Sequence, residues 1–328
     1  LSLFTVHASS VEARTQVRIA RLQSDRTVLR EVVKQQTTGE RAGFGGAGQT
    51  AAGSVLTNVN AELAALRKKQ RRQNKSASER RRQRKKQAVT VGLAGYTNAG
   101  KSSLFRNLSG KEVLVENRLF STLESTIGRL EASPRVLLAD TIGFIDGLPN
   151  AALDAFRATL AEAIECDLLL LLVDVGDPIK EIDRKLQTSL RELSERVLDS
   201  NHSSVMERIQ LVLTKADSTS QASIDSAIEM VATHGFINPI VISSHTGIGI
   251  EELRATMLHA LFGPQRTVML HPGEHDEPAI ESLLSRLFDS VYVHDHQREG
   301  DFIEVRISAS DETLAILQST YGERIELK

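Results

Sequence analysis

The chain has 328 residues, of which 40 are basic and 42 acidic, so its formal net charge is −2. Its single cysteine, Cys166, excludes a disulfide framework and indicates a reducing compartment. The longest strongly apolar run, DLLLLLVDV at 167–175, is too short to cross a bilayer, so we expect no membrane span and a cytoplasmic location. The sequence starts at Leu1 rather than Met, so a longer natural N-terminus stays open, and with it an organellar matrix or partial membrane association.

Two helical segments joined by a glycine-rich tip are predicted at the N-terminus. Residues 11–35 carry apolar residues at helical spacing, and so do residues 55–66, where the spacing is four, four and three. Between them, GERAGFGGAGQTAAG at 39–53 has six glycines and little apolar bulk, which predicts a flexible loop. We therefore expect a long helical hairpin with Val55, Val59, Leu63 and Leu66 on one stripe of its second arm.

A strongly basic run extends this second arm. Residues 67–86 hold twelve Lys or Arg and one acid, Glu79, so the rest of the chain has 28 basic against 41 acidic residues, or −13. Such segregation of charge indicates a polyanionic partner at one end of the molecule. The alternative is a solvated helix face that binds nothing.

From Ala88 onward, short apolar runs alternate with helical stretches. This alternation predicts an α/β fold with a mostly parallel sheet and helices on both faces. After GPQ at 263–265, the pattern predicts a small α+β unit of about sixty residues. We expect three parts: residues 1–87 with the hairpin and basic arm, 88–263 with the parallel sheet, and 264–328.

The segment GYTNAGKS at 95–102 fits G-x-x-x-x-G-K-[ST] between a predicted strand and a predicted helix. The glycines let the backbone approach phosphates, whose charge is met by amide groups and a helix N-terminus. Lys101 would reach the β- and γ-phosphates, and the Ser102 hydroxyl would ligate Mg²⁺. The predicted phosphate-binding residues are Gly95, Tyr96, Thr97, Asn98, Ala99, Gly100, Lys101 and Ser102.

Three further segments follow predicted strands. In DTIG, Asp140 would hold Mg²⁺ through water and the Gly143 amide would sense the γ-phosphate. In TKAD, Asp217 would accept two hydrogen bonds that guanine offers and adenine does not, and SSH would bring an amide to the guanine oxygen. These motifs indicate a GTP-binding unit, with ATP as the weaker alternative. Their residues are Asp140, Thr141, Ile142, Gly143, Thr214, Lys215, Ala216, Asp217, Ser243, Ser244 and His245.

The blocks GYTNAGKSSLF, LFSTLEST, LLADTIGFIDGLP, AFRATLAEA and VDVGDP resemble the HflX GTPases over nearly the whole chain. The resemblance implies a monomeric GTPase that binds the large ribosomal subunit or the whole ribosome and acts in splitting, rescue or recycling. It also implies that the hairpin reaches ribosomal RNA, with the basic run as an anchor for rRNA phosphates. A GTPase of large-subunit assembly or of tRNA, and a non-catalytic RNA-binding protein, stay open as alternatives.

The resemblance also aligns FSTLE at 120–124 with the family's segment that closes over the γ-phosphate. It implies a second Mg²⁺ ligand at Thr122 beside Ser102, with Thr126 as a competitor. The aligned residues are Phe120, Ser121, Thr122, Leu123 and Glu124.

Phe144 stands where many GTPases have a glutamine that orients water, so we expect slow intrinsic hydrolysis that ribosomes stimulate. The resemblance implies that Asn98 helps to bind K⁺ there, while a loop cap is the alternative role. We expect Lys101, Asn98 and Gly143 to carry catalysis.

Three departures from the family pattern stand out. Thr214 replaces the usual Asn, the tip at 43–50 lacks Gly-Pro-Gly-Glu, and most of the family's N-terminal subdomain is missing. The first predicts weaker nucleotide binding, and the second leaves the ribosomal contact of the tip open.

Overall fold

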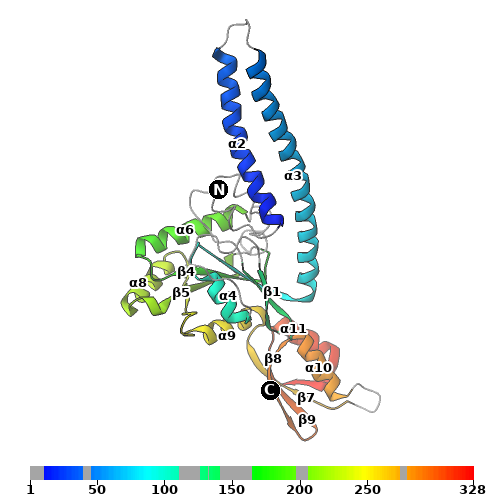
Figure 1. Cartoon of the computed structure of the whole chain (residues 1–328). Helices are drawn as coiled ribbons and strands as arrows, with labels where there is room; N and C mark the ends of the chain where they lie inside the picture. Colours follow the sequence, from blue (N-terminus) through cyan, green and yellow to red (C-terminus); the bar gives the residue numbers. More distant parts are fainter. Residues whose placement is uncertain are drawn as a thin grey trace.

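The computed structural model describes residues 11–39, 46–110, 126–131, 133–140, 165–196, 206–273 and 279–328. A helical hairpin projects from one end of a central α/β unit, and a smaller α+β unit lies at the opposite end (Figure 1). Within these residues, no helix combines the length and apolar character that crossing a bilayer requires.

The hairpin consists of α2 (Val11–Gly39) and α3 (Gly46–Gln87). Its apolar seam is formed by Ile19 and Leu22 of α2 against Leu63 of α3, with Val59 and Leu66 partly buried beside them. Arg18 Nε donates to Glu62 across the seam at 2.9 Å. The predicted stripe holds except at its end, because Val55 is 46% exposed.

The predicted loop over 39–53 is wrong for Gly39 and for residues 46–53, which are helical. Once α3 has formed, adding a residue at its end needs no new nucleus, and Ala51 and Ala52 favour the helix. The rest of the predicted loop, 40–45, lies outside the described residues.

The central sheet has six strands in the order β2-β3-β1-β4-β5-β6. Five are parallel, as predicted, whereas β2 runs antiparallel to β3 and was not expected. β2 lies on the edge of the sheet and alternates only weakly in hydrophobicity, which hides it in the sequence. The strands are β1 (Val89–Gly95), β2 (Thr126–Glu131), β3 (Val136–Asp140), β4 (Leu168–Asp174), β5 (Ile209–Thr214) and β6 (Ile240–Val241).

Helices cover both faces of this sheet. On one face, α6 (Ile179–Arg196) and α8 (Gln221–Ala232) bury Leu169 and Leu171 of β4. On the other, α4 (Lys101–Ser109) and α9 (Ile250–Phe262) bury Leu170 and Leu172 of the same strand. The run of leucines in β4 thus serves two apolar cores, as expected for an inner parallel strand.

Cys166 is buried. Its Sγ donates to the Leu168 carbonyl at 3.0 Å, and burial raises the pKa of the thiol to about 12. A thiol that stays protonated is a poor nucleophile.

The C-terminal unit is an antiparallel sheet in the order β10-β7-β9-β8 with two helices on one face. Its connectivity is strand, helix, strand, strand, helix, strand, and the strands β7, β8 and β10 were not predicted. The elements are β7 (Gln265–Leu270), α10 (Ile280–Ser290), β8 (Tyr292–Glu299), β9 (Phe302–Ser308), α11 (Asp311–Tyr321), the 3₁₀ turn η2 (Gly322–Arg324) and β10 (Ile325–Leu327).

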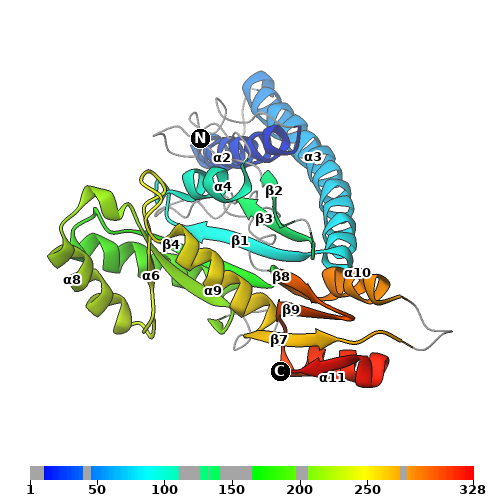
Figure 2. The same cartoon turned by 90° about the horizontal axis from the view of Figure 1, so that it is seen from below.

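Direct side-chain contacts join this unit to the central one. Figure 2 shows β8 and β9 beside the end of α9, where the rings of Phe262 and Tyr292 stack at 6.1 Å. Arg254 of α9 pairs with Glu131 at the end of β2, and burial raises the pKa of Tyr292 nearby. The α+β unit is therefore joined to α9 through Tyr292, and the Ser133 hydroxyl, just after β2, donates to the Phe288 carbonyl of α10 at 2.8 Å.

Candidate nucleotide-binding site

The segment 95–102 forms a tight loop between β1 and α4. Gly95 has φ +145°, and a Cβ there would lie 2.4 Å from the Leu172 carbonyl oxygen, so only glycine fits. Gly100, with φ 85°, is the N-terminal cap of α4 and offers no side chain to the first-turn amides. The helix start is therefore open to an anionic ligand.

Lys101 is buried beneath this loop. Its Nζ donates to the carbonyl oxygens of Gly95 at 3.2 Å and Tyr96 at 2.8 Å. Burial lowers the pKa of Lys101 to about 8, and the charge of Asp140 acts in the opposite direction. Two carbonyl oxygens of the loop thus hold the ammonium group in place.

Asn98 has a left-handed backbone, with φ 65°, which asparagine adopts more readily than most residues. Its side chain is exposed and makes no hydrogen bond to the residues that the structure describes. The predicted side-chain cap is therefore not seen there, and the backbone conformation is its visible structural role.

Ser102 and Asp140 meet at the end of β3. The Ser102 hydroxyl donates to Asp140 Oδ2 at 2.8 Å, and both side chains are buried. Thr126 is the cross-strand partner of Asp140 at the start of β2. The other predicted residues of this side lie outside the described ranges: Phe120, Ser121, Thr122, Leu123, Glu124, Thr141, Ile142, Gly143 and Phe144.

The loop after β5 is tied to the loop that holds Lys101. Thr214 is buried, and its hydroxyl donates to the carbonyl oxygens of Ala99 at 2.9 Å and Val173 at 3.1 Å. Two residues after Lys215, Asp217 lies in the 3₁₀ turn η1 (Ala216–Ser218). Thr214 therefore bridges two segments that are 115 residues apart in the sequence.

The loop after β6 contacts Asp217 directly. Ser243 Oγ donates to Asp217 Oδ1 at 2.5 Å, and this hydrogen bond is the main cause of the lowered pKa of Asp217. His245 Nδ1 lies 4.0 Å from Asp217 Oδ2, while Asn107 of α4 donates to the Ser244 carbonyl at 2.8 Å. The residues predicted on β1, β3, β5 and β6 that the structure describes thus gather at the carboxyl ends of parallel strands, where such sheets bind ligands.

Sequence reasoning missed two contacts at this edge. Asp174, at the end of β4, pairs with Lys215, and the Tyr96 ring lies 5.3 Å from the Lys185 ammonium. An acid that ends an apolar strand, as Asp140 does on β3, is the signal by which Asp174 could have been found.

Three features lie on this doubly covered parallel sheet: the glycine-rich loop 95–102, the buried pair of Ser102 and Asp140, and the acidic loop 214–218, here called the base-side loop. Together they define a P-loop nucleotide-binding protein of the GTPase type. The family model described as "50S ribosome-binding GTPase" matches residues 90–238. "GTPase HflX" of Methanocaldococcus jannaschii is 34% identical over 285 residues, which are 87% of this chain and 67% of the relative. "GTPase HflX" of Gluconacetobacter diazotrophicus is 34% identical over 93% of this chain and 64% of its own length.

The chain therefore belongs to the HflX family of GTPases. It spans between 51% and 67% of the length of the first three curated relatives. Among solved structures, a complex of SsGBP with GDP has 24% identity and a TM-score of 0.50, covering 79% of this chain and 70% of that one, and shows the same fold.

Proposed function

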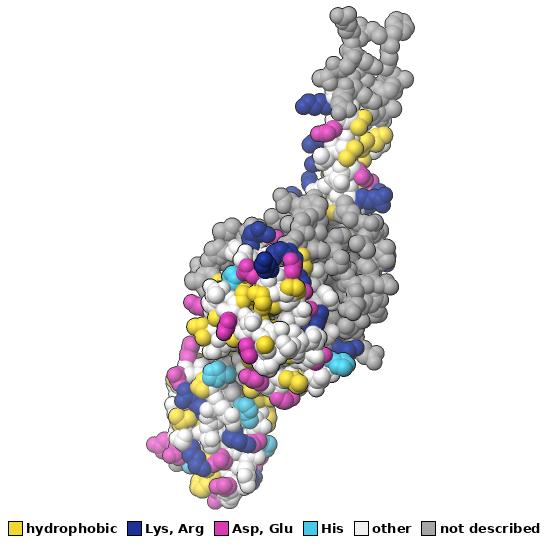
Figure 3. All heavy atoms as spheres, turned by 90° about the vertical axis from the view of Figure 1, so that its left-hand side faces the viewer, with side chains coloured by type: hydrophobic (Ala, Val, Ile, Leu, Met, Phe, Trp, Pro, Cys, Tyr) yellow, Lys and Arg dark blue, Asp and Glu magenta, His cyan; other side chains and the backbone are white. Residues whose placement is uncertain are grey.

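We propose that this protein binds and hydrolyses GTP and acts on the ribosome, with its basic helical arm docked on rRNA of the large subunit. The observation that carries the ribosomal part is the basic arm. Described side chains of α3 at Arg67, Lys68, Lys69, Arg71, Arg72 and Lys75 are all exposed. Figure 3 shows Lys and Arg side chains along the described part of the hairpin.

A helix with this charge attracts the phosphate backbone through counterion release and needs no base-specific contact. The central unit carries the nucleotide, so the same molecule can couple GTP to an RNA-bound state. Splitting, rescue or recycling of ribosomes is the role we propose for that coupling, in a monomeric cytoplasmic protein.

Within the nucleotide site, we assign the phosphates to residues 95–102 and guanine to Asp217, with residues 243–245 beside it. Ser102 and Asp140 supply oxygen atoms 2.8 Å apart in a buried position, a set that fits Mg²⁺. Bound there, the ion would neutralise charge on the phosphates. Lys101 orients the β- and γ-phosphates, and the backbone amides of the first turn of α4 bind them.

GTP hydrolysis measured with and without ribosomes tests the whole proposal. We expect slow turnover alone, faster turnover with ribosomes, and cosedimentation of the GTP-bound protein with them. Binding to free subunit precursors, but not to finished ribosomes, would instead indicate a role in assembly. GTP hydrolysis that ribosomes leave unchanged would contradict the proposal.

Substitution of Asp217 tests the base assignment. Asp217→Asn should weaken GTP binding about tenfold or more and shift the preference toward xanthosine triphosphate, because the carboxylate accepts two hydrogen bonds from guanine. Competition binding with GTP, xanthosine triphosphate and ATP measures this. Unchanged selectivity would remove Asp217 from the guanine site.

A further inference from the structure

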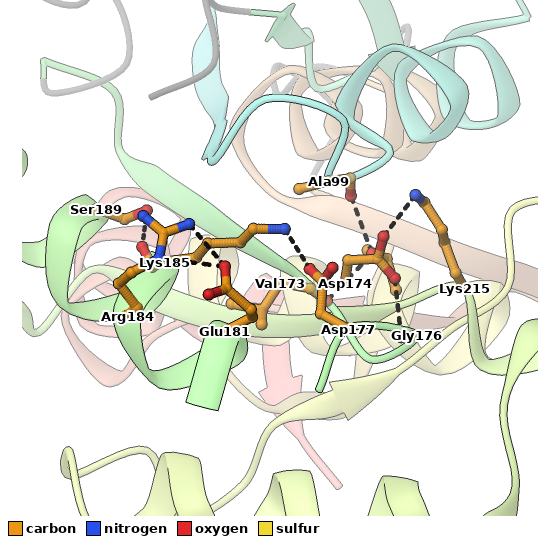
Figure 4. A network of polar contacts seen from close by, with 11 residues as sticks. Ala99, Val173, Asp174, Gly176, Asp177, Glu181, Arg184, Lys185, Ser189 and Lys215 are labelled. Atoms are coloured by element: carbon orange, nitrogen blue, oxygen red, sulfur yellow. Dashed lines mark hydrogen bonds and ion pairs between the residues drawn. The ribbon is translucent and has the colours of Figure 1, made fainter. Parts of the chain in front are cut away.

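Asp174 is the last residue of β4 and Asp177 lies in the turn that follows, and each binds a lysine from a different element (Figure 4). Asp174 Oδ2 accepts from Lys215 Nζ at 2.5 Å, and Lys215 belongs to the loop that carries Asp217. Asp177 Oδ2 accepts from Lys185 Nζ, also at 2.5 Å, on helix α6. The two pairs are similar in chemistry, but only the first reaches the base-side loop.

The Asp174 pair lies where two loops touch. The other oxygen of Asp174 accepts from the Gly176 amide at 2.9 Å, which closes the turn. A Cβ at Gly176 would lie 3.1 Å from Ser218 Oγ, so the turn packs directly against the segment that follows Asp217. Asp174 is therefore rigidly placed relative to the base-side loop.

Lys215 has an unusual backbone for a lysine, with φ 61° and ψ 37°. Its neighbour Thr214 is anchored to Ala99 and Val173, so the start of the side chain is fixed as well. Between this fixed start and the ammonium held by Asp174 lie four methylene groups. An unrestrained lysine would lose rotamer freedom on packing against a ligand, whereas a lysine held at both ends has already lost it.

We propose that Asp174 is a positioning residue for guanine recognition: it holds the Lys215 stem as a preformed apolar wall beside Asp217. The inference rests on the proposed assignment of Asp217 to guanine. The Asp174–Lys215 pair then contributes to nucleotide affinity without touching the nucleotide. Because it lies on the base side, it should affect GDP and GTP equally, raise KM and leave kcat unchanged.

Calorimetric titration with GDP compares Asp174→Asn, Lys215→Met and the double variant. Lys215→Met keeps an apolar stem but loses the ammonium, so both single changes break the same link. We expect each to weaken GDP binding about three- to tenfold, and the double variant to be no weaker than either. Lys215→Ala, which also removes the stem, should bind more weakly still.

Asp295→Asn is the matched control, since it removes an equal charge and breaks an exposed ion pair, that with Arg306, in the C-terminal sheet. It should leave GDP affinity within about twofold of the original. Thermal unfolding without nucleotide identifies a misfolded variant, and Lys215→Met then tests the link from the partner side.

Additive losses in the double variant, or wild-type affinity in Lys215→Met, would overturn the inference. So would a loss in Asp295→Asn as large as in Asp174→Asn. The Asp217→Asn variant distinguishes a failure of the guanine assignment from a failure of the positioning role of Asp174. If it leaves guanine selectivity unchanged, the base assignment fails; if selectivity shifts while Asp174→Asn is silent, only the positioning role fails.

Discussion

The protonation of Lys101 affects both the stability of the protein and its affinity for nucleotides. With its pKa lowered to about 8 by burial, Lys101 loses its proton in the folded chain at a lower pH than in the unfolded chain. Between about pH 8 and 10.4 the unfolded state therefore binds more protons, and this group makes stability rise with pH in that window. The affinity for nucleotides has the opposite trend and falls as the pH rises, because the phosphates bind to the charged ammonium of Lys101.

We therefore predict that GDP affinity falls about tenfold between about pH 7 and 9. Titration calorimetry at constant ionic strength measures it. In Lys101→Arg, whose guanidinium stays charged, the affinity is lower but its dependence on pH should be flat. An equal slope in both proteins would assign the effect to another group.

Asn98 offers a second test at this scale, because two roles give different outcomes. We propose that its side-chain oxygen helps to bind K⁺, an ion that would stabilise negative charge on the phosphates as an arginine does. Its φ of 65° is the competing reason for an asparagine. Asn98→Gly keeps the backbone freedom and removes the oxygen, whereas Asn98→Ala removes both.

Hydrolysis is measured in KCl and in NaCl at equal ionic strength. We expect the original chain to be about tenfold or more faster in KCl, and both variants to lose this preference. If only the backbone matters, Asn98→Gly keeps the original rate and Asn98→Ala is slower in both salts alike.

At the scale of elements, the edge strand β2 depends on a close approach to α4. A Cβ on Gly128 would lie 2.5 Å from Ser109 Cβ and 2.9 Å from the Phe105 ring, and both belong to α4. Gly128→Ala should therefore lower the free energy of unfolding by about 1–3 kcal/mol, as overpacking does. Chemical denaturation checks this value.

Gly53 is the matched control, because it lies inside α3 with nothing within 4 Å of an added Cβ. Gly53→Ala should stabilise the hairpin by about 0.5–1 kcal/mol, since alanine loses less conformational freedom in a helix. If both changes are neutral, β2 is not held against α4 as the structure shows.

The strands and helices also show what could and could not be predicted from the sequence. Parallel strands such as β4 are buried on both faces, so they read as apolar runs and were found. Strands β2, β7, β8 and β10 were missed, because each buries at most one face and its polar residues make the sequence resemble a loop. Gly39 and residues 46–53, on either side of the tip, were misjudged because local glycine content says nothing about the long helices that include them.

For the site, motif spacing placed four strand ends correctly, because carboxyl ends of parallel strands meet at one edge. Lys101, Ser102, Asp140 and Asp217 lie at that edge, as the motifs predicted, and their roles toward the nucleotide stay predictions. The Asp174–Lys215 pair was not, since an ion pair between two loops leaves no spacing pattern in the chain. Residues 120–124 and 141–143 stay predictions.

For the whole molecule, the distribution of charge decides the mode of binding that we propose. Twelve basic residues lie in one helical arm, and the remainder of the chain carries −13. Repulsion from RNA should therefore orient the rest of the molecule away while the arm approaches. Ribosome affinity must then depend on salt through the arm and not through basic residues elsewhere.

If about six of the arm's cations meet phosphates, the slope of log affinity against log salt should approach −5 on the duplex coefficient, or about −4 on the single-strand one. Changing Arg71, Arg72 and Lys75 to Gln should make this slope shallower by about two to three, since Gln keeps the helix and removes only charge. Cosedimentation with ribosomes over a range of KCl concentrations measures it.

The control replaces three exposed cations of other helices, Lys180, Arg191 and Arg286, with Gln, and its slope should match the original. A flat salt response, or equal slopes in the two triple variants, would show that the arm is a solvated face, because only phosphate contacts release counterions at the arm.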